Sequence, residues 1–437
     1  MTPDKSKWDK APSPNYSNTN NLKYPYSDFP YTELYQTVPL DRECKKTLIV
    51  DYWGEGRIVT KDGLITGFKD AYNVNHQYKL VSNGPDIYKR IPNRIPVKDY
   101  DSLNTKNYIE DGFADFVTIM GSPATDNCSN DIARIVNKNN GVVILYDITG
   151  DDLKWLTESL KKISFYPILS HDVPPPFNEI VLHEGFTVRS FYPENIFIKK
   201  AADIIKKDRN EGAEILRQIN KLNNDVLLNN VINQSINTFS SGLIECAHVL
   251  YLSKDEDDIK LFKRLPVPIQ SLFNGANLKI INYNYSVNAV LKSTKNSSSD
   301  IRVYGGKYEN SDRFKWQFSV ENKPDATLFF ILNFHSTSST DKYRLYLEIA
   351  QDKDGDREAW VRVINEENAA KNKRFKWKIE CAKANDNIIF KFYNSEFSGQ
   401  FLKVIESADA YGDRKAMGSS FTDNQNHLRD IWTLSPL

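Results

Sequence analysis

The 437-residue chain lacks the features that mark several protein classes. Its 57 basic and 57 acidic residues give a formal net charge of zero at pH 7, so it has no surplus of either sign. A protein that neutralises nucleic-acid phosphates needs a basic surplus. A transmembrane helix needs about 18 consecutive apolar residues, and this chain has no such run. We therefore predict neither a nucleic-acid partner nor a membrane span.

Residues suited to metal binding or catalysis are few and scattered. The 4 cysteines form no Cys-x-x-Cys spacing, and the 6 histidines are isolated from one another and form no His-x-x-x-His spacing. The chain contains neither a Gly-x-Ser-x-Gly elbow nor a P-loop. The sequence thus predicts no metal site and no catalytic residue of these types. The cysteines are Cys44, Cys128, Cys246 and Cys381.

The composition changes twice within the first half of the chain. Residues 1–42 are rich in proline, tyrosine and asparagine, which disfavour helix and sheet, so we expect an extended arm. Its first 21 residues contain no apolar stretch, and we expect no secretory signal in the chain as given. In residues 43–202, apolar runs at 48–50, 116–120 and 142–146 alternate with helical segments at 129–136 and from Asp151, the expected N-cap. Such continuous runs predict an α/β domain with a parallel sheet.

Residues 203–284 have the pattern of a helical domain. Apolar residues recur every three or four positions between Ile215 and Ala247, which is typical of packed amphipathic helices. Asn223, Asn224 and Gly242 are expected to divide this stretch into two or three helices. We expect one more helix over residues 269–280.

Internal repetition dominates residues 285–437. The sequence Arg-Phe-Lys-Trp at 313–316 returns at 374–377 and, as Arg-Asp-Ile-Trp, at 429–432. A Gly-Asp-Arg marker at 355–357 returns at 412–414, and Leu-Lys or Leu-Glu markers at 291, 347 and 402 keep a similar interval. Runs at 329–334 and 388–393 indicate strands between the markers. Three strand-rich copies predict a β-trefoil, which closes its sheet around a pseudo-threefold axis.

The repeats also suggest which residues build the core and which meet a ligand. Trp316, Trp377 and Trp432 occupy equivalent positions, so we predict that they fill the shared core rather than stack on a ligand. Acidic and basic side chains on the loops after the Leu markers have the hydrogen-bonding groups that bind sugar hydroxyls. The same Gly-Asp-Arg segments are equally compatible with purely structural turns. The carbohydrate-site candidates are Asp354, Asp356, Arg357, Asp413 and Arg414.

Several segments of the second half resemble a known family. They are Ile-Glu-Cys-Ala-His-Val-Leu-Tyr at 244–251, Leu-Pro-Val at 265–267, Ile-Phe-Lys-Phe-Tyr-Asn at 389–394 and Gly-Asp-Arg-Lys-Ala-Met-Gly at 412–418. With them, residues 205–437 resemble the thirty-kilodalton lipoproteins of moth haemolymph, whose members join a helical domain to a β-trefoil. The long N-terminal part of this chain is a departure from the compact family pattern.

The resemblance implies a function without catalysis. It implies binding of carbohydrate or lipid, storage in body fluid, roles in immunity and an extracellular location, and it implies no catalytic residue. The resulting hypothesis is a lectin-like, non-enzymatic binding protein in storage, recognition or defence, including toxicity toward a parasite or a role in an insect virus. Neither the ligand nor the oligomeric state follows from the sequence.

The α/β domain has a weaker resemblance, to class I methyltransferases. Residues 99–100, 113–121 and 131–146 are similar to the fourth strand, the helix that follows it and the fifth strand of that fold. A cofactor site there requires a glycine-rich turn after strand one, a helix, and an acidic residue at the end of strand two. Under this alternative, S-adenosylmethionine is the cofactor. Its candidate contacts are Asp51, Gly54, Gly56 and Asp70.

Two features of the turn argue against an active methyltransferase site. Trp53 places a large side chain where backbone must approach the cofactor. If strand two is at residues 65–68, only residues 57–64 precede it, which are too few for a helix of three turns. We therefore favour a degenerate domain that binds no cofactor. The alternative is a methyltransferase that the trefoil brings to its substrate.

Overall fold

The computed structural model describes a little over half of the N-terminal half of the chain and most of the C-terminal half. The described residues are 49–54, 72–75, 79–80, 89–90, 94–96, 105–107, 109–120, 124–146, 148–168, 173–174, 187–295, 301–321, 327–334, 344–351, 357–397, 399–419 and 429–437. The chain divides into two compact units, Met1–Ile198 and Lys199–Leu437. The predicted arm at residues 1–42 lies outside the described residues.

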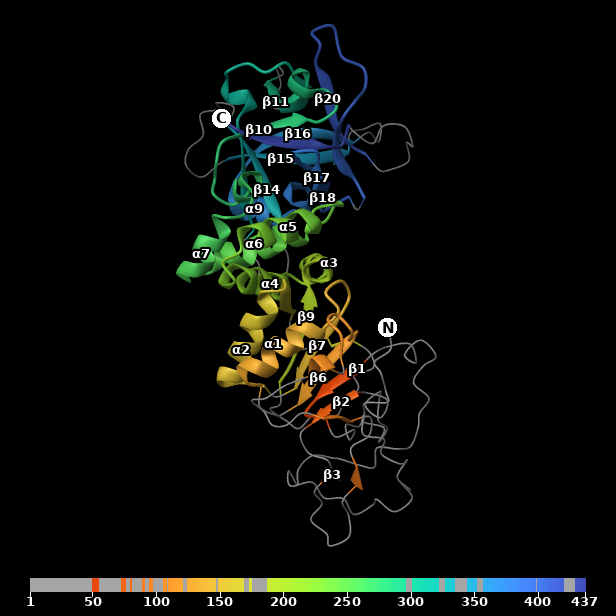
Figure 1. Cartoon of the computed structure of the whole chain (residues 1–437). Helices are drawn as coiled ribbons and strands as arrows, with labels where there is room; N and C mark the ends of the chain where they lie inside the picture. Colours follow the sequence, from red (N-terminus) through yellow and green to blue (C-terminus); the bar gives the residue numbers. More distant parts are fainter. Residues whose placement is uncertain are drawn as a thin grey trace, which may run out of the picture. The chain divides into compact units, whose positions relative to one another are not determined.

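The first unit contains a seven-stranded sheet in the order β5-β2-β1-β6-β7-β9-β8 (Figure 1). Strands β5, β2, β1, β6 and β7 are parallel, whereas β9 is antiparallel to both β7 and β8. Two short strands, β3 and β4, pair separately. The strands are β1 (Ile49–Tyr52), β2 (Tyr72–Asn75), β3 (Lys79–Leu80), β4 (Lys89–Arg90), β5 (Arg94–Pro96), β6 (Phe116–Met120), β7 (Val142–Tyr146), β8 (Phe165–Ile168) and β9 (Val188–Pro193).

The parallel sheet confirms the prediction from the apolar runs. Strands β1, β6 and β7 lie on those runs, and Val50, Val117 and Val143 in them are fully buried. After β1 the chain builds the sheet outward through β2 and β5, then returns to place β6 on the other side of β1. This reversal between β1 and β6 is the point where doubly wound sheets bind ligands, outside the carboxyl ends of the strands.

Two helices pack against each other beside this sheet. They are α1 (Asp126–Ile135) and α2 (Gly150–Lys161). The N-cap of α1 is Thr125, whose hydroxyl accepts a hydrogen bond from the Cys128 amide. The expected cap of α2 at Asp151 is wrong, because the helix already begins at Gly150 and its N-cap is Thr149. Asp151 instead lies in the first turn of α2, where its negative charge interacts favourably with the positive end of the helix dipole.

The second unit begins with the predicted helical region. Helix α3 (Glu194–Lys207) spans the boundary between the two units. The helices that follow it are α4 (Arg209–Lys221), α5 (Asp225–Ser235), α6 (Gly242–Leu252), α7 (Glu256–Phe262) and α8 (Val267–Gln270). Both expected breaks occur where the sequence indicates them. The Asn224 side chain caps α5 by accepting from the Leu227 amide, and α6 begins at Gly242. A Cβ at Gly242 would lie 2.3 Å from the Ile205 carbonyl oxygen, so α3 and α6 can approach closely only because this residue is glycine.

The expected helix at 269–280 is wrong. Helix α8 ends at Gln270, Gly275 has a φ of +67°, and residues from Leu278 onward form strand β10. The left-handed glycine ends helical geometry, and Leu278 and Ile280 alternate with more exposed neighbours as a strand requires. No helix in the part of the chain that the structure describes combines the length and the apolar character needed to span a membrane.

The last twelve strands form three lobes of four strands each. A ring of six strands closes through the pairs β10–β13, β13–β14, β14–β17, β17–β18, β18–β21 and β21–β10. The hairpins β11–β12, β15–β16 and β19–β20 meet through pairs between β12, β16 and β20. A closed six-stranded barrel with a triangular set of hairpins is the pattern of a β-trefoil, as predicted.

The strands of the trefoil follow one another along the chain, four to each lobe. They are β10 (Leu278–Asn282), β11 (Val290–Lys295), β12 (Ile301–Gly306), β13 (Trp316–Val320), β14 (Phe329–Asn333), β15 (Arg344–Gln351), β16 (Arg357–Ile364), β17 (Trp377–Ala384), β18 (Asn387–Asn394), β19 (Phe401–Val404), β20 (Arg414–Ser419) and β21 (Trp432–Pro436). Helix α9 (Glu366–Lys371) lies between β16 and β17.

The three repeat tryptophans are core residues, which confirms their interpretation. Trp316, Trp377 and Trp432 are fully buried, and each indole N–H donates to a leucine carbonyl oxygen. The asparagines that end the first strand of each lobe repeat as well. The side-chain amides of Asn282, Asn333 and Asn394 all donate to backbone carbonyls near the tryptophan of a lobe.

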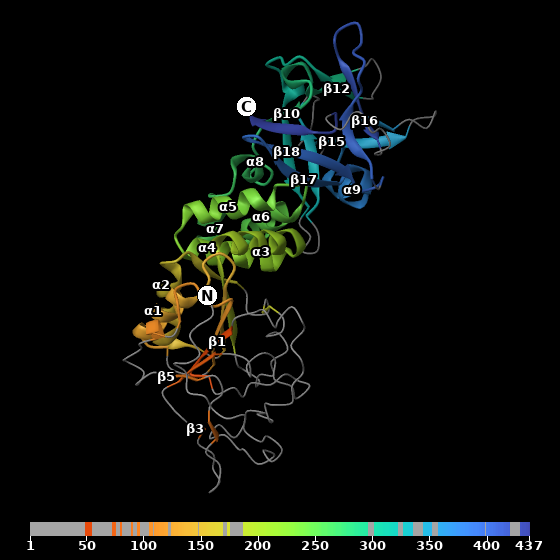
Figure 2. The same ribbon diagram turned by 45° about the vertical axis from the view of Figure 1, so that its right-hand side comes forward.

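The helices of the second unit are joined to its barrel by backbone hydrogen bonds. Ser240 and Cys381 exchange amide and carbonyl bonds, and the Lys383 amide donates to the Ile236 carbonyl. Figure 2 shows α5 and α6 next to β17 and β18, and α6 contacts β17. The helical part and the trefoil therefore form one continuous packed body.

Candidate functional site

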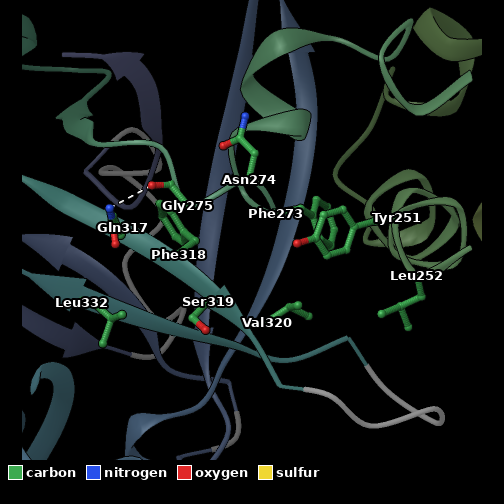
Figure 3. Close-up of a pocket in the computed structure, with 10 residues that line it drawn as sticks. All are labelled: Tyr251, Leu252, Phe273, Asn274, Gly275, Gln317, Phe318, Ser319, Val320 and Leu332. Carbon is green, nitrogen blue, oxygen red and sulfur yellow. Dashed lines mark hydrogen bonds between the residues drawn. The ribbon is translucent and has the colours of Figure 1, made fainter. Parts of the chain in front are cut away.

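A pocket of about 450 Å³ lies where the helices of the second unit meet the trefoil (Figure 3). We call it the junction pocket. Its lining comes from the end of α6, the turn after α8, strand β13 and strand β14. The lining residues are Tyr251, Leu252, Phe273, Asn274, Gly275, Gln317, Phe318, Ser319, Val320 and Leu332. This volume falls within the range of pockets that hold one small ligand.

Aromatic rings from three segments take part in the wall of the junction pocket. The ring centroids of Tyr251 and Phe273 are 5.4 Å apart, and Figure 3 shows the two rings side by side. Phe273 also contacts Phe329 of β14 with centroids 5.4 Å apart, and Phe318 packs beside Phe329. Because the Phe273 and Phe318 side chains are 5% and 2% exposed, this part of the lining is fixed by core packing.

Two residues at the end of α6 leave apolar surface open to solvent. Tyr251 is 41% exposed and Leu252 is 45% exposed, although most other residues of α6 are buried. Together they leave apolar surface beside the pocket open to a ligand. The sequence contains a signal of this pair, because the apolar run of α6 continues past the residues that face the core.

The polar groups of the junction pocket are neutral. None of the ten described residues that line it carries a charge. The Gln317 amide donates to the Gly275 carbonyl and to the Asn277 side chain, at 2.8 and 3.0 Å, so its orientation is fixed. Asn274 and Ser319 supply further amide and hydroxyl groups. The pocket thus offers hydrogen bonds without a formal charge.

A buried histidine lies behind the pocket wall. The His248 ring stacks on Phe273 with centroids 5.8 Å apart and is fully buried. Its Nδ1 lies 3.0 Å from the Thr327 hydroxyl and 3.2 Å from Arg209 Nη2. Burial, assisted by the Arg209 charge, lowers the pKa of His248 to about 4. The ring is therefore neutral at pH 7, and Nδ1 accepts the Arg209 hydrogen bond.

The predicted carbohydrate residues lie on the hairpin side of the trefoil. The Asp413 carboxylate is 2.7 Å from Lys292 Nζ in an ion pair whose side chains are 17% and 9% exposed. The Arg414 guanidinium lies over the Tyr285 ring, 3.9 Å from its centroid, and Arg357 lies over the Phe397 ring at 4.7 Å. Asp354 and Asp356 lie outside the described residues. Asp413 and Arg414 are thus already engaged with neighbouring side chains.

The loop before β20 presents an aromatic side chain that the sequence analysis did not single out. Tyr411 is 92% exposed. Its amide and that of Asp413 both donate to Asp409 Oδ1, and Gly412 has a φ of +80°. These bonds hold the turn, so Tyr411 is displayed on an ordered backbone. Exposed aromatic rings on such turns stack on flat apolar ligand faces.

In the first unit, the candidate cofactor turn is filled by protein. Asp51 is 2% exposed and accepts a hydrogen bond from the Thr118 hydroxyl of β6 at 2.8 Å. Trp53 is 6% exposed, has a φ of +57°, and packs edge-on against Tyr52. A Cβ at Gly54 would lie 2.3 Å from Asp51 Oδ2. The left-handed conformation of a tryptophan is costly, so the surrounding packing must hold it.

The structure places the second strand of the sheet later in the chain than the sequence spacing predicts. The strand next to β1 is β2 at Tyr72–Asn75, not residues 65–68. An acidic residue at the end of strand two would therefore stand near Asn75, whereas Asp70 precedes the strand. Gly56 and Asp70 lie outside the described residues. The interval between Gly54 and β2 is long enough for a helix, so spacing no longer argues against a cofactor.

The described residues contain neither a metal cluster nor an activated thiol. No group of three or more histidine, cysteine, aspartate or glutamate side chains among them could hold a metal ion. Cys128, Cys246 and Cys381 are buried and unpaired. Burial raises the pKa of Cys246 and of Cys381 to about 12 and raises the pKa of Cys128 further. These thiols are protonated at pH 7 and are poor nucleophiles.

Comparison with known proteins relates the second unit to a protein family. A family model described as lepidopteran low molecular weight (30 kD) lipoprotein matches residues 195–435. The low molecular mass lipoprotein PBMHP-12 of Bombyx mori is 28% identical over 193 residues, which are 44% of this chain and 69% of that protein. Microvitellogenin of Manduca sexta is 26% identical over 203 residues, 46% of this chain and 76% of its own length.

Solved structures give weaker likenesses. A mosquitocidal holotoxin has a TM-score of 0.29 at 17% identity and covers 38% of this chain and 18% of its own. The Rhizoctonia solani agglutinin has a TM-score of 0.26 at 12% identity, with 38% of this chain and 97% of that chain covered. At these scores the likeness carries no weight beyond the strand pairings described above.

Proposed function

Because the chain belongs to the lepidopteran low molecular weight (30 kD) lipoprotein family, we propose that it is a non-enzymatic binding protein of insect body fluid that holds an apolar ligand in the junction pocket. We propose that this binding serves storage, recognition or defence. An extracellular location belongs to the same proposal and rests on the family to which the chain belongs.

The junction pocket is the observation that carries the proposal. It lies within the residues that the family model matches, and its lining combines core-packed rings with the exposed side chains of Tyr251 and Leu252. Burying this apolar surface under a ligand is favourable by about 25 cal/mol for each Å² removed from water. A ligand with an apolar body and an uncharged polar head would cover this surface and still meet the polar groups of the lining.

Titration with Nile red, an uncharged dye that fluoresces in apolar surroundings, tests the proposal. We expect saturable binding to the full chain. Ser319→Trp adds an indole to the partly exposed face of β13 that lines the pocket, and should weaken binding at least about tenfold, equivalent to about 1.4 kcal/mol. Ser435→Trp is the matched control, because Ser435 is a partly exposed serine of β21 that does not line the pocket.

The outcomes of this titration are distinct. Loss of binding in Ser319→Trp together with wild-type binding in Ser435→Trp supports the junction pocket as the site. Equal binding in both variants would place the dye elsewhere and overturn the assignment. Melting temperatures of the variants show whether either substitution unfolds the protein, and a folded Ser319→Trp variant is required for the comparison.

Carbohydrate binding at the loop before β20 is a second candidate function. The observation in its favour is Tyr411, which is 92% exposed on a turn held by Asp409 and followed directly by Asp413 and Arg414. A sugar face stacked on this ring would bring its hydroxyls near those two side chains. Arg357, with Asp354 and Asp356 before it, belongs to the equivalent segment of the preceding lobe.

A glycan array tests the second candidate. Tyr411→Ala should abolish a glycan signal of the wild-type protein without loss of stability, because the side chain has few contacts to lose. Asp413→Ala should also reduce the signal, although it removes the ion pair with Lys292. Asp356→Ala probes the preceding lobe. Unchanged glycan binding in Tyr411→Ala, Asp413→Ala and Asp356→Ala would overturn this site.

The methyltransferase alternative remains a separate proposal for the first unit. Asp51 at the reversal between β1 and β6 favours it, since that edge is where parallel sheets bind ligands. Trp53 opposes it, because the buried indole occupies the turn. Calorimetric titration with S-adenosylmethionine separates the two hypotheses. Micromolar binding would support a cofactor, and no heat at millimolar ligand would remove the alternative.

A further inference from the structure

We infer that the junction pocket selects uncharged ligands, such as long-chain alcohols, over their anionic counterparts, such as fatty acids. This inference rests on the proposed binding function and names the chemical class of ligand for the same pocket. It follows from the charge of the lining, from the polar groups at its rim and from the packing behind its wall.

The lining offers no cationic side chain that could form an ion pair with a carboxylate. Its ten described residues include no lysine, arginine or histidine. A carboxylate that leaves water without a cationic partner loses several kcal/mol of solvation or must take up a proton. A hydroxyl group loses far less, and one hydrogen bond compensates for it.

The rim supplies the hydrogen bonds that an uncharged head group needs. The Gln317 amide is oriented by its two donated bonds, to the Gly275 carbonyl and the Asn277 side chain. Because that amide nitrogen is engaged, the side-chain oxygen of Gln317 is the group that remains to accept from a ligand. Ser319, two residues along the same strand, adds a hydroxyl that both donates and accepts.

The buried histidine behind the wall does not change this charge balance. His248 stacks on Phe273 and is fully buried, and Arg209 contacts it from α4. Neither His248 nor Arg209 lines the pocket. A ligand carboxylate at the rim would therefore meet amide and hydroxyl dipoles but no formal positive charge.

Competition against Nile red at pH 8 with 1-decanol and with decanoate tests the inference, because the two ligands share one chain length. In the wild-type protein we expect 1-decanol to compete at least about tenfold more strongly than decanoate. Leu252→Lys places a cation at the pocket mouth, where Leu252 is 45% exposed. It should raise the affinity for decanoate about tenfold and leave that for 1-decanol nearly unchanged.

Val363→Lys is the matched control, because Val363 is 49% exposed and does not line the pocket. This variant should keep the wild-type preference for 1-decanol. Equal competition by decanoate and 1-decanol in the wild-type protein would overturn the inference while leaving the binding function intact. Failure of both ligands to compete, together with no Nile red binding, would instead overturn the proposed function itself.

Discussion

Trp316 donates its indole N–H to the carbonyl oxygen of Leu291 at 2.8 Å, and the same relationship joins Trp377 to Leu347 and Trp432 to Leu402. Each leucine belongs to a hairpin of the trefoil, and each tryptophan begins the last strand of its lobe. The bond therefore connects the hairpins to the barrel three times over. Its repetition explains why a tryptophan follows each leucine marker at a similar interval, 25, 30 and 30 residues along the sequence.

Replacing any one of these tryptophans by phenylalanine should destabilise the trefoil by a similar amount. The substitution leaves a buried leucine carbonyl without its donor and opens a small cavity, which together cost about 2–4 kcal/mol. We expect Trp316→Phe, Trp377→Phe and Trp432→Phe to agree within about 1 kcal/mol in urea unfolding.

Trp155→Phe is the control for this series, because Trp155 is 39% exposed and should cost under about 0.5 kcal/mol. A threefold axis of equal lobes would be contradicted if one of the three core variants were as stable as the wild-type protein.

Acidification should weaken the contact between the helices and the trefoil through His248. Its pKa in the folded protein is about 4, below the ordinary value near 6.5, because burial and Arg209 disfavour the charged ring. Between pH 6.5 and 4 the unfolded chain therefore binds a proton that the folded chain does not. The free energy of unfolding should fall over this window by up to about 3 kcal/mol and stay level, for this group, above pH 7.5.

The measurement is the difference between the wild-type protein and His248→Gln as a function of pH. The variant loses this titration, so the stability difference should shrink as the pH falls from 6.5 to 4. The other 5 histidines contribute equally to both proteins and cancel in the difference. A difference that does not depend on pH would show that His248 titrates normally in the folded protein.

The ion pair between Lys376 and Glu321 should behave as a buried pair. The Nζ–Oε1 distance is 2.8 Å, and the side chains are 7% and 8% exposed. Lys376→Met leaves a buried carboxylate without this partner and should cost about 3 kcal/mol, whereas adding Glu321→Leu should recover most of the loss. Chemical unfolding of the single and double variants measures both effects.

The exposed pair Lys371–Glu367 supplies the comparison. Its side chains are 69% and 77% exposed, so Lys371→Met should cost under about 0.5 kcal/mol. If the double variant at 376 and 321 were no more stable than Lys376→Met alone, the charge pair would not be the source of the effect.

Gly242→Ala should disrupt the crossing of α3 and α6. The new methyl group would meet the Ile205 carbonyl oxygen and the Lys206 Cα at 2.3 and 2.6 Å, and backbone atoms cannot move aside as a flexible side chain can. We expect a loss of about 1–3 kcal/mol despite the better helix propensity of alanine. Asn229→Ala, at an exposed position of α5, should be neutral or slightly stabilising. Melting temperatures of the two variants provide the comparison.

Local and repeated patterns made much of this fold predictable from the sequence. Strands β6 and β7 coincide with continuous apolar runs, and the core position of Trp316 followed from its repetition. Predictions failed where two structures suit the same residues. Residues 65–68 resemble a strand, yet β1 pairs with Tyr72–Asn75. Residues 269–280 are apolar enough for a helix, but α8 ends at Gln270 and the chain turns through Gly275 into strand β10.

The junction pocket could not be predicted in the same way. Tyr251, Phe273, Gln317 and Leu332 come from four separate segments, and only the packing of α6 against the trefoil brings them together. No local motif records that arrangement. The predicted sugar residues Asp413 and Arg414 were chosen as charged loop residues, and the structure shows partners for both that a linear pattern cannot reveal.

A crystal structure of the full chain grown with saturating 1-decanol tests the central claim most directly. The account predicts electron density for the alcohol between Tyr251 and Phe318, with its hydroxyl within hydrogen-bonding distance of Gln317 or Ser319. Density for the alcohol at another surface of the second unit, with the junction pocket left without it, would contradict the account.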